Sequence, residues 1–533
     1  MKGVELWVGL GLTGVILCFH GIRCARAGPL WRDEAAAVGL ATMPSARDVV
    51  HYFPHEAFPL LFPATVRTVA AVSEDCDAGW RLFGLLVGIG IVGVLWLNLW
   101  LLRRGVPLFA LALLGFNGAF IQWGDAIRGY GLGTLFILLT LGLVWRIVER
   151  PSPWRFAGAT LAAVASVQFL FHNPALVLAI CFGAMAVAVR RGAMRQAALV
   201  LLSGVAAAAS LLPYWGLLRH GRGWDVVVRT PVTVGGLVHK LGETLSVSGW
   251  SNTWIWALLF FLAVGVCVAG QVRRTTVPDN AQDLQLFCGI ALVMAVVGHF
   301  CFLRILSYVT RPWYYLALMG FVAILLDLVF DTLPPRRAVR SARVVLVLVM
   351  AVTSLPLLWD QIRVRQSNVD LIAQKLGREA GRDDFIVVAP WFMGISFARY
   401  YRGTTGWMTL PPMDFHRFHR FDLLQAQMAV PDQEEPIRPL LEKITETLKN
   451  DHRVWVVGHL VTAMPDPAAA KLATDDQQGA QANADIAAWS IKVGAQLRAA
   501  AGHVETVRVD TEGPENPLET LTLSVFRGWA PAP

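Results

Sequence analysis

The chain has 533 residues, of which 55% are hydrophobic and only 16% are charged, and its formal net charge at pH 7 is +8. This composition, with a mean hydropathy of +0.51, excludes an ordinary soluble protein and indicates an integral membrane protein. Much of the basic excess falls in short clusters between apolar segments. Such clusters are a signal of membrane topology, so the charge gives no reason to expect a nucleic-acid partner.

Apolar segments that approach the roughly 20 residues of a membrane-spanning helix recur along the first two thirds of the chain. They lie near residues 5–22, 81–102, 107–123, 131–148, 157–171, 174–189, 197–215, 253–271, 284–303, 313–330 and 342–358. We therefore predict a polytopic α-helical membrane protein with about 11 transmembrane helices. The first segment is followed by Ala25-Arg26-Ala27, which has the form of a signal-peptide cleavage site. Its apolar run is long and its basic start is only Lys2, so we interpret it as a retained helix.

Every second connection between these segments is short and rich in arginine, as at 190–195. The positive-inside rule assigns such loops, and with them the N-terminus, to the cytoplasm. The long connections at about 23–80 and 216–252 then face outward, as does the tail of the chain. Cys24 and Cys76 share the first of these outer loops, and the sequence alone does not decide whether they form a disulfide.

From about residue 359 the density of charged residues rises and no further spanning segment occurs. We therefore predict two domains, a transmembrane domain at 1–358 and an extracytoplasmic domain at 359–533. The hydrophobic pattern of the second domain predicts strands at 385–390, 454–458 and 521–526, a helix at 395–401 and a mobile loop at 475–485. These elements favour a soluble α/β fold.

Two histidines and two arginines gather in this second domain, at His416, Arg417, His419 and Arg420. We interpret them as a solvated face of the domain. The domain shows no glycine-rich phosphate loop, metal-ligand spacing or Ser/His/Asp arrangement that would point to a separate active site.

Two adjacent carboxylates, Asp33 and Glu34, follow the first apolar segment. Further along the same outer loop, His55 and Glu56 lie in an apolar, proline-containing stretch at 52–60 that has the composition of an interfacial helix. Ionisable residues in such a stretch can line a site at the boundary of the lipid.

Asp125 and Arg128, followed by Tyr130, lie between two predicted spanning helices. Ionisable groups at membrane depth are candidates for a functional site, because their desolvation must be offset by a partner or a ligand. Arg304 and Arg311 flank another outer junction, where they run against the positive-inside bias. A lipid phosphate would account for them, since guanidinium groups match phosphate oxygens.

Taken in order, these residues resemble the GT-C glycosyltransferases, in particular the branch that uses lipid carriers and includes the protein O-mannosyltransferases and the aminoarabinose transferases of lipid A. The matching features are Asp33-Glu34, His55-Glu56-Ala57-Phe58-Pro59-Leu60, Trp80-Arg81-Leu82-Phe83-Gly84, Asp125-Ala126-Ile127-Arg128-Gly129-Tyr130, and Arg311 with Tyr314 and Tyr315. The chain departs from the family at Phe58, which replaces the first proline of a Pro-Pro pair.

The resemblance implies an inverting glycosyltransferase that moves a sugar from a polyprenyl-phosphate carrier to an acceptor hydroxyl, on the extracytoplasmic face of the bacterial inner membrane. It implies that Asp33 is the general base, with Glu34 as the second catalytic carboxylate. The residues expected to bind the donor phosphate are Arg128, Arg304 and Arg311. The candidates for the substrate pocket are His55, Glu56, Asp125, Tyr130 and Tyr314.

No cofactor is firmly implied, and a divalent cation at Asp33, Glu34 or Glu56 stays an alternative. The expected partners are the lipid-linked sugar, membrane lipids and an acceptor that is a glycolipid, a polysaccharide or a protein. Two other classes of protein compete: a transporter that binds its substrate at Asp125 and Arg128, and a non-catalytic assembly protein of the envelope. The clustering of ionisable residues at outer helix ends, with no evident inverted repeat, argues against the transporter.

Overall fold

The computed structural model describes residues 2–56, 58–73, 75–216, 232–247, 249–272, 279–308, 310–334, 336–460 and 477–530. The chain forms two compact units. Unit 1 consists of Met1–Arg26, Ala57–Trp215 and Val232–Arg363, and unit 2 of Ala27–Glu56, Gly216–Pro231 and Val364–Pro533. Residues 217–231 and 248 of the predicted outer loop at 216–252 lie outside the described residues.

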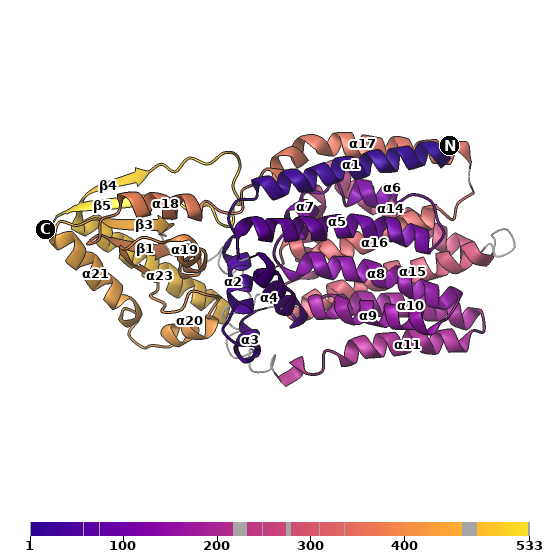
Figure 1. Ribbon diagram of the computed structural model, residues 1–533, viewed down its shortest axis with the longest axis horizontal. Coiled ribbons are helices and arrows are strands. Elements are labelled where there is room, and N and C mark those ends of the chain that lie inside the picture. The colour runs from indigo at the N-terminus through magenta and orange to yellow at the C-terminus, as the bar shows by residue number, and fades with distance from the viewer. Residues whose placement is uncertain are drawn as a thin grey trace. The chain divides into compact units, whose positions relative to one another are not determined.

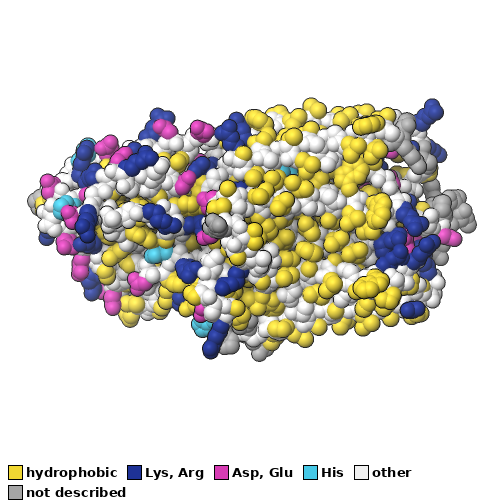
Figure 2. Space-filling view, in the orientation of Figure 1, with side chains coloured by type: hydrophobic (Ala, Val, Ile, Leu, Met, Phe, Trp, Pro, Cys, Tyr) yellow, Lys and Arg dark blue, Asp and Glu magenta, His cyan; other side chains and the backbone are white. Residues whose placement is uncertain are grey.

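Unit 1 is helical (Figure 1). Its elements are α1 (Lys2–Arg26), α4 (Leu61–Ser73), α5 (Asp77–Leu101), α6 (Leu108–Leu113), α7 (Gly118–Gly124), α8 (Gly129–Glu149), α9 (Pro153–Phe169), α10 (Asn173–Arg190), α11 (Met194–Ala209), α13 (Val234–Ser246), α14 (Trp250–Val272), α15 (Asp279–Leu306), η3 (Pro312–Tyr315), α16 (Leu316–Phe330) and α17 (Arg337–Ile362). Large apolar side chains such as Trp7, Trp100 and Phe261 are exposed on these helices. Hydrophobic side chains accordingly cover most of the face of the helices seen in Figure 2, as expected for a surface in contact with lipid.

Among the described residues, eight helical segments are long and apolar enough to cross a membrane: α1, α5, α8, α10, α14, α15, η3 with α16, and α17. They confirm the prediction of a polytopic membrane protein. The other three predicted segments form shorter helices, namely α6 and α7, α9, and α11. The segment at 107–123 is divided, because α6 ends at Leu113 and Asn117 caps a new helix by accepting the N–H of Phe120 at 3.2 Å.

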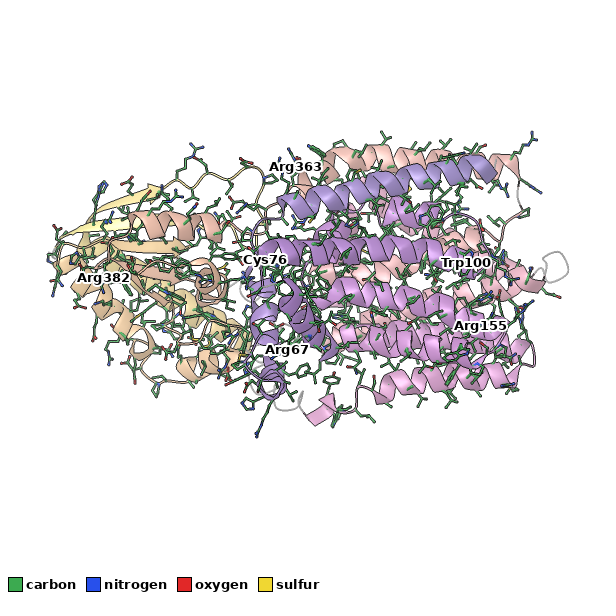
Figure 3. All side chains as sticks on the ribbon, viewed as in Figure 1. Arg67, Cys76, Trp100, Arg155, Arg363 and Arg382 are labelled. Carbon is green, nitrogen blue, oxygen red and sulfur yellow. The ribbon has the colours of Figure 1, made fainter. Side chains whose placement is uncertain are left out.

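Two labelled residues mark the opposite ends of helix α5 in unit 1. Helix α5 runs between the two ends marked by Cys76 and Trp100 in Figure 3, and Arg155 lies at the same end as Trp100. Neither Cys76 nor Cys24 is in a disulfide.

Elsewhere in the unit, the buried carboxylate of Asp327 accepts the N–H of Phe109 at 2.9 Å and that of Ala110 at 2.7 Å, which satisfies amide groups at the start of α6.

A five-stranded sheet forms the centre of unit 2. The strands are β1 (Phe385–Ala389), β2 (Gly406–Thr409), β3 (Val454–Gly458), β4 (Ala501–Val507) and β5 (Leu523–Trp529), in the order β2-β1-β3-β5-β4. Strand β1 is parallel to β2 and β3, whereas β5 is antiparallel to β3 and β4. In the register of the central strands, Val454 pairs with Phe385 on one side and with Phe526 on the other.

Helices cover both faces of this sheet. The helical elements of unit 2 are α2 (Arg32–Ala41), α3 (Ala46–Tyr52), η1 (Phe53–His55), α18 (Val369–Glu379), η4 (Trp391–Met393), α19 (Gly394–Tyr400), α20 (Phe421–Met428), η5 (Glu435–Ile437), α21 (Arg438–Lys449) and α23 (Gln477–Ala500). Side chains of β1 alternate, so that Val387 packs with residues of α21 and α23, and Val388 with residues of α18 and α19. The predicted α/β fold of the tail is therefore confirmed.

Two features of unit 2 were not expected from the sequence: the helical start of α23 and the place of residues 27–56. The predicted loop at 475–485 is wrong for residues 477–485, which form the first turns of α23, while Asp475 lies outside the described residues. Residues 27–56, which belong to the predicted first outer loop, cluster with the α/β tail. Both α2 and α3 are therefore parts of unit 2.

Asp384 fixes the start of the central strands. Its buried carboxylate accepts hydrogen bonds from the N–H of Gly381 at 2.8 Å, the N–H of Arg453 at 2.9 Å and the indole of Trp455 at 3.1 Å. Burial alone would raise the pKa of Asp384, but these hydrogen bonds outweigh it, so the pKa lies below its usual value.

We predict that Asp384→Ala lowers the free energy of unfolding by about 2–4 kcal/mol near neutral pH, because several buried donors lose their acceptor. A carboxyl whose pKa is lowered by folding stabilises the protein above its unfolded pKa and loses this effect as the pH falls through its folded pKa. Thermal unfolding in detergent should therefore show the difference between variant and wild type shrinking below about pH 4. Asp383→Ala, at the exposed neighbouring position, is the control and should leave stability unchanged.

Candidate functional site

The acidic pair of the sequence stands at the first turn of α2, where the two carboxylates have different surroundings. Glu34 is fully buried and accepts the N–H of Trp31 at 3.4 Å in a capping box. The side chain of Asp33 keeps 21% of its surface exposed. Of the pair, Asp33 is therefore the carboxylate that a substrate can reach.

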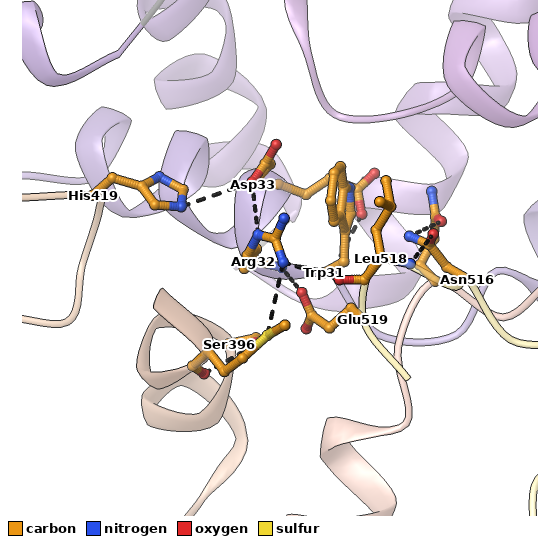
Figure 4. A network of polar contacts seen from close by, with 11 residues as sticks. Trp31, Arg32, Asp33, Ser396, His419, Asn516, Leu518 and Glu519 are labelled. Carbon is orange, nitrogen blue, oxygen red and sulfur yellow. Dashed lines mark hydrogen bonds and ion pairs between the residues drawn. The ribbon is translucent and has the colours of Figure 1, made fainter. Parts of the chain in front are cut away.

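Two basic side chains, Arg32 and His419, flank Asp33 (Figure 4). Its Oδ1 lies 3.4 Å from Nε of Arg32 and 3.8 Å from Nε2 of His419. The imidazole of His419 is stacked on the ring of Phe421, with centroids 5.6 Å apart, and lies edge-on to Trp391. The prediction that His419 belongs to a solvated face of the domain is therefore wrong.

The loop that carries His419 lies against α2. A Cβ atom added to Gly39 would come within 2.1 Å of the backbone oxygen of Arg417, so the close approach requires glycine there. The guanidinium of Arg417 donates to the carbonyl of Thr42 at 3.0 Å and to its hydroxyl at 3.2 Å. The backbone contact thus fixes the position of the histidine opposite Asp33.

His55 and Glu56 lie at the end of η1 in unit 2. The imidazole of His55 is stacked on Phe418, with centroids 5.8 Å apart, and its Nδ1 lies 3.8 Å from a carboxylate oxygen of Asp422. Burial lowers the pKa of His55 to about 4, and the charge of Asp422 opposes this effect only in part. Glu56 is half-buried, and its N–H donates to the carbonyl of Phe53 at 3.0 Å.

In unit 1, Asp125 lies at the junction of α7 and α8 and forms a buried hydrogen-bonded pair with His20. Nδ1 of His20 lies 2.7 and 2.9 Å from its two carboxylate oxygens. Glycines on α5 make room for this pair, because a Cβ atom at Gly84 would lie 2.0 Å from the backbone oxygen of Asp125 and one at Gly88 would lie 2.4 Å from its Oδ1. The buried guanidinium groups of Arg23 and Arg81 also act on this carboxylate.

Arg128 and Tyr130 are held by an aromatic cluster at the same junction. The guanidinium of Arg128 lies 4.6 Å from the centroid of the Phe58 ring, a cation–π contact. The Tyr130 ring lies 5.1 Å from Phe58 and 5.8 Å from Tyr314, which itself lies 5.1 Å from the ring of His172. The structure therefore brings three predicted residues, Arg128, Tyr130 and Tyr314, into one neighbourhood.

The other two predicted arginines of unit 1 are exposed. Arg304 lies in the last turn of α15, and Arg311 immediately precedes η3. Within the part of the chain that the structure describes, neither guanidinium has a hydrogen-bond or ion-pair partner. By contrast, Arg343, on another helix of this unit, pairs with the buried carboxylate of Asp327.

The sequence reasoning did not identify the partners of the two aspartates, His20 and His419. His20 lies inside the first apolar segment and His419 nearly 400 residues after Asp33, so no local pattern marks either one. Across the described ranges there is no group of three or more His, Cys, Asp or Glu residues arranged to hold a metal ion. We therefore derive no step through a metal.

No protein-family model matches this sequence, and no curated protein matches it. The chain shares its fold with solved structures, two of which are crystal structures of ArnT from Cupriavidus metallidurans. The one bound to undecaprenyl phosphate has a TM-score of 0.53 at 13% identity, over 97% of this chain and 98% of that one. The apo structure has a TM-score of 0.51 at 14% identity, over 85% and 93%. The fold that the resemblance implied is thereby confirmed.

We predict that His55 makes the protein less stable in acid. Its pKa is about 4 in the folded chain and about 6.5 in an unfolded one, so between these values the unfolded state binds the extra proton. Stability should therefore fall by up to about 3 kcal/mol as the pH falls from 6.5 to 4. In His55→Gln this contribution is absent, and the thermal midpoint should decline less steeply over the same range. His51→Gln, at an exposed position on α3, should follow the wild-type curve.

Proposed function

We propose that this protein is an inverting glycosyltransferase that moves a sugar from a polyprenyl-phosphate carrier to an acceptor hydroxyl. The observation that carries the proposal is an accessible carboxylate, Asp33, flanked by Arg32 and His419 on a fold shared with ArnT. One of the ArnT crystal structures is bound to undecaprenyl phosphate, which supports a lipid phosphate as the donor of this chain as well.

In the proposed reaction, Asp33 accepts the proton of the acceptor hydroxyl as the oxygen attacks the anomeric carbon of the sugar. The new bond from oxygen to carbon forms on the face opposite the phosphate, so the configuration inverts. The bond between the carbon and the phosphate oxygen breaks, and its electron pair leaves with the polyprenyl phosphate. A positioned general base of this kind contributes roughly 10²- to 10⁴-fold to the rate.

The leaving phosphate is a weak base, and it needs compensation of its charge more than it needs a proton. The proposal gives this role to Arg128, Arg304 and Arg311, two of which are exposed arginines with no protein partner in the described chain. The aromatic packing of Arg128 keeps its side chain ordered without neutralising its charge. Glu34 supports the catalytic turn, and the remaining predicted pocket residues are His55, Glu56, Asp125, Tyr130 and Tyr314.

We place the reaction on the extracytoplasmic face of the bacterial inner membrane, with the N-terminus in the cytoplasm. The support is the distribution of arginine-rich loops, which the positive-inside rule assigns to the cytoplasm. The α/β domain then lies outside the cytoplasm, where a glycolipid, a polysaccharide or a protein can serve as acceptor.

We predict that Asp33→Asn reduces release of free polyprenyl phosphate by at least about 10²-fold, because the acceptor hydroxyl loses its base. The measurement uses purified protein in liposomes, a panel of polyprenyl-phosphate sugars and a membrane extract as the source of acceptor. Asp48→Asn, which changes a partly exposed carboxylate in the first turn of α3, is the matched control and should keep full activity.

Equal turnover by wild type and Asp33→Asn would sink the role of Asp33. Failure of the wild type to release polyprenyl phosphate from any donor would reject the transferase and favour a transporter or an assembly protein. Binding of the lipid by Asp33→Asn at wild-type affinity separates loss of chemistry from loss of the site.

We also predict that Arg128→Gln, Arg304→Gln and Arg311→Gln each lower kcat/KM for the lipid donor by about 10- to 10³-fold, because each removes positive charge from the leaving phosphate. Raising the salt concentration should weaken donor binding by the wild type more than by these variants. Arg195→Gln, at an exposed arginine in the first turn of α11 on the opposite predicted side, is the control. An unchanged kcat/KM in a variant would remove that arginine from the phosphate site.

A further inference from the structure

A second carboxylate lies beside the catalytic turn, and the proposed reaction does not use it. Glu519 precedes β5 and is 0% exposed. Its Oε2 accepts the N–H of Arg32 at 2.6 Å, so it binds an amide that α2 leaves free at its first residue (Figure 4). An anion at this place is favoured by the helix dipole.

The turn that carries Glu519 is itself fixed by hydrogen bonds. The N–H of Glu519 donates to the carbonyl of Asn516 at 2.9 Å, and the N–H of the fully buried Asn516 donates to the carbonyl of Arg365 at 2.8 Å. The side chain of Asn516 also accepts the N–H of Leu518 at 3.1 Å. The carboxylate of Glu519 therefore cannot follow α2 if the helix shifts.

Arg32 connects this turn to the proposed base. Its Nη1 donates to the carbonyl of Leu518 at 2.9 Å, while its Nε faces Oδ1 of Asp33 at 3.4 Å. The guanidinium also lies 4.5 Å from the ring centroid of Phe392. Arg32 is thus bound from three sides, and its charge acts on Glu519 as well as on Asp33.

We propose that Glu519 is a positioning residue for the catalytic carboxylate: it holds the first turn of α2 through the backbone N–H of Arg32 and, when ionised, offsets part of the positive charge that Arg32 presents to Asp33. This inference rests on the proposed function, since it assumes that Asp33 is the base. When Glu519 is neutral, the positive charge of Arg32 acts on Asp33 without a second carboxylate to offset it. When Glu519 is ionised, its negative charge offsets part of the charge of Arg32, and Asp33 becomes the better proton acceptor.

The surroundings of Glu519 place the change between its neutral and ionised forms in the physiological pH range. Burial raises the pKa of Glu519 to about 7, against the charge and backbone hydrogen bond of Arg32, which lower it. The charged and titratable groups near it on α2 are Arg32, Asp33 and Glu34, and the group that faces Asp33 from the neighbouring loop is His419. The serines of α19 and of the segment before α18, Ser396 and Ser367, contribute only hydroxyl groups.

The first arm of the test is the pH profile of kcat for release of polyprenyl phosphate by the full-length protein in liposomes, between pH 6 and 8. We expect the wild type to gain about three- to tenfold over this range, because the base is strengthened as Glu519 ionises. Glu519→Gln keeps the shape of the side chain but stays neutral, so its profile should be flat at the level of the wild type at pH 6. Glu519→Asp should retain the rise, and Glu505→Gln, at an exposed carboxylate of β4, should match the wild type.

The second arm needs no donor. Hydrogen exchange of the amides of Arg32 to Ala36 at pH 8 should be about tenfold faster in Glu519→Gln than in the wild type, because the amide of Arg32 loses a charged acceptor. Equal exchange in the two proteins would overturn the positioning role. The role would also be overturned if the rise persisted in Glu519→Gln and vanished in His419→Gln, since His419 would then set the profile. A wild type without turnover rejects the proposed function, and the exchange arm then decides the positioning role alone.

Discussion

A charge that leaves water needs a partner, and this constraint accounts for the surroundings of the buried carboxylates Asp125 and Asp327 in unit 1. Asp125 meets His20, and Asp327 meets Arg343, each pair joining different segments of the chain. These pairs also hold helices together, since Asp327 caps the start of α6 from α16. Against this background of paired groups, Arg304 and Arg311 stand out, because within the described part of the chain their exposed guanidinium groups have no protein partner.

In unit 2 the corresponding constraint is the start of a helix. The first amides of α2 lack partners within the helix, and two carboxylates supply acceptors from different directions. Glu34 does so from within the first turn, and Glu519 from the far end of the chain. The helix is therefore fixed at its first residue, next to Asp33. A carboxylate that must meet a substrate in one geometry gains from such support, because a small displacement of a catalytic group costs much of the rate.

Much of this fold can be predicted because its signals are local. An apolar run of about 20 residues predicts a spanning helix wherever it occurs. Strand β1 is predicted from a short apolar run that follows charged residues, since both of its faces are buried. Strand β4 is not predicted, because its side chains are mostly exposed and show no apolar alternation. The start of helix α23 is not predicted either, because Gln and Ala residues carry little periodic signal.

The candidate site can be predicted only where its residues have a local context. Asp33, Arg128 and Arg311 stand at the ends of apolar segments, where a charge attracts attention. His419 has no such context, because what places it against Asp33 is the backbone contact of Gly39 with Arg417. Contacts of this kind depend on tertiary packing between segments hundreds of residues apart, and no spacing in a single sequence records them.

The membership of residues 27–56 in unit 2 has a consequence for how the protein is made. The turn that carries Asp33 is among the first parts of the chain to be synthesised, but Glu519, which holds it, is among the last. The early segment therefore reaches its final packing only after almost the entire polypeptide has been synthesised. The start of α2 is thus completed late in folding, and a chain that stops before Glu519 lacks the acceptor that fixes it.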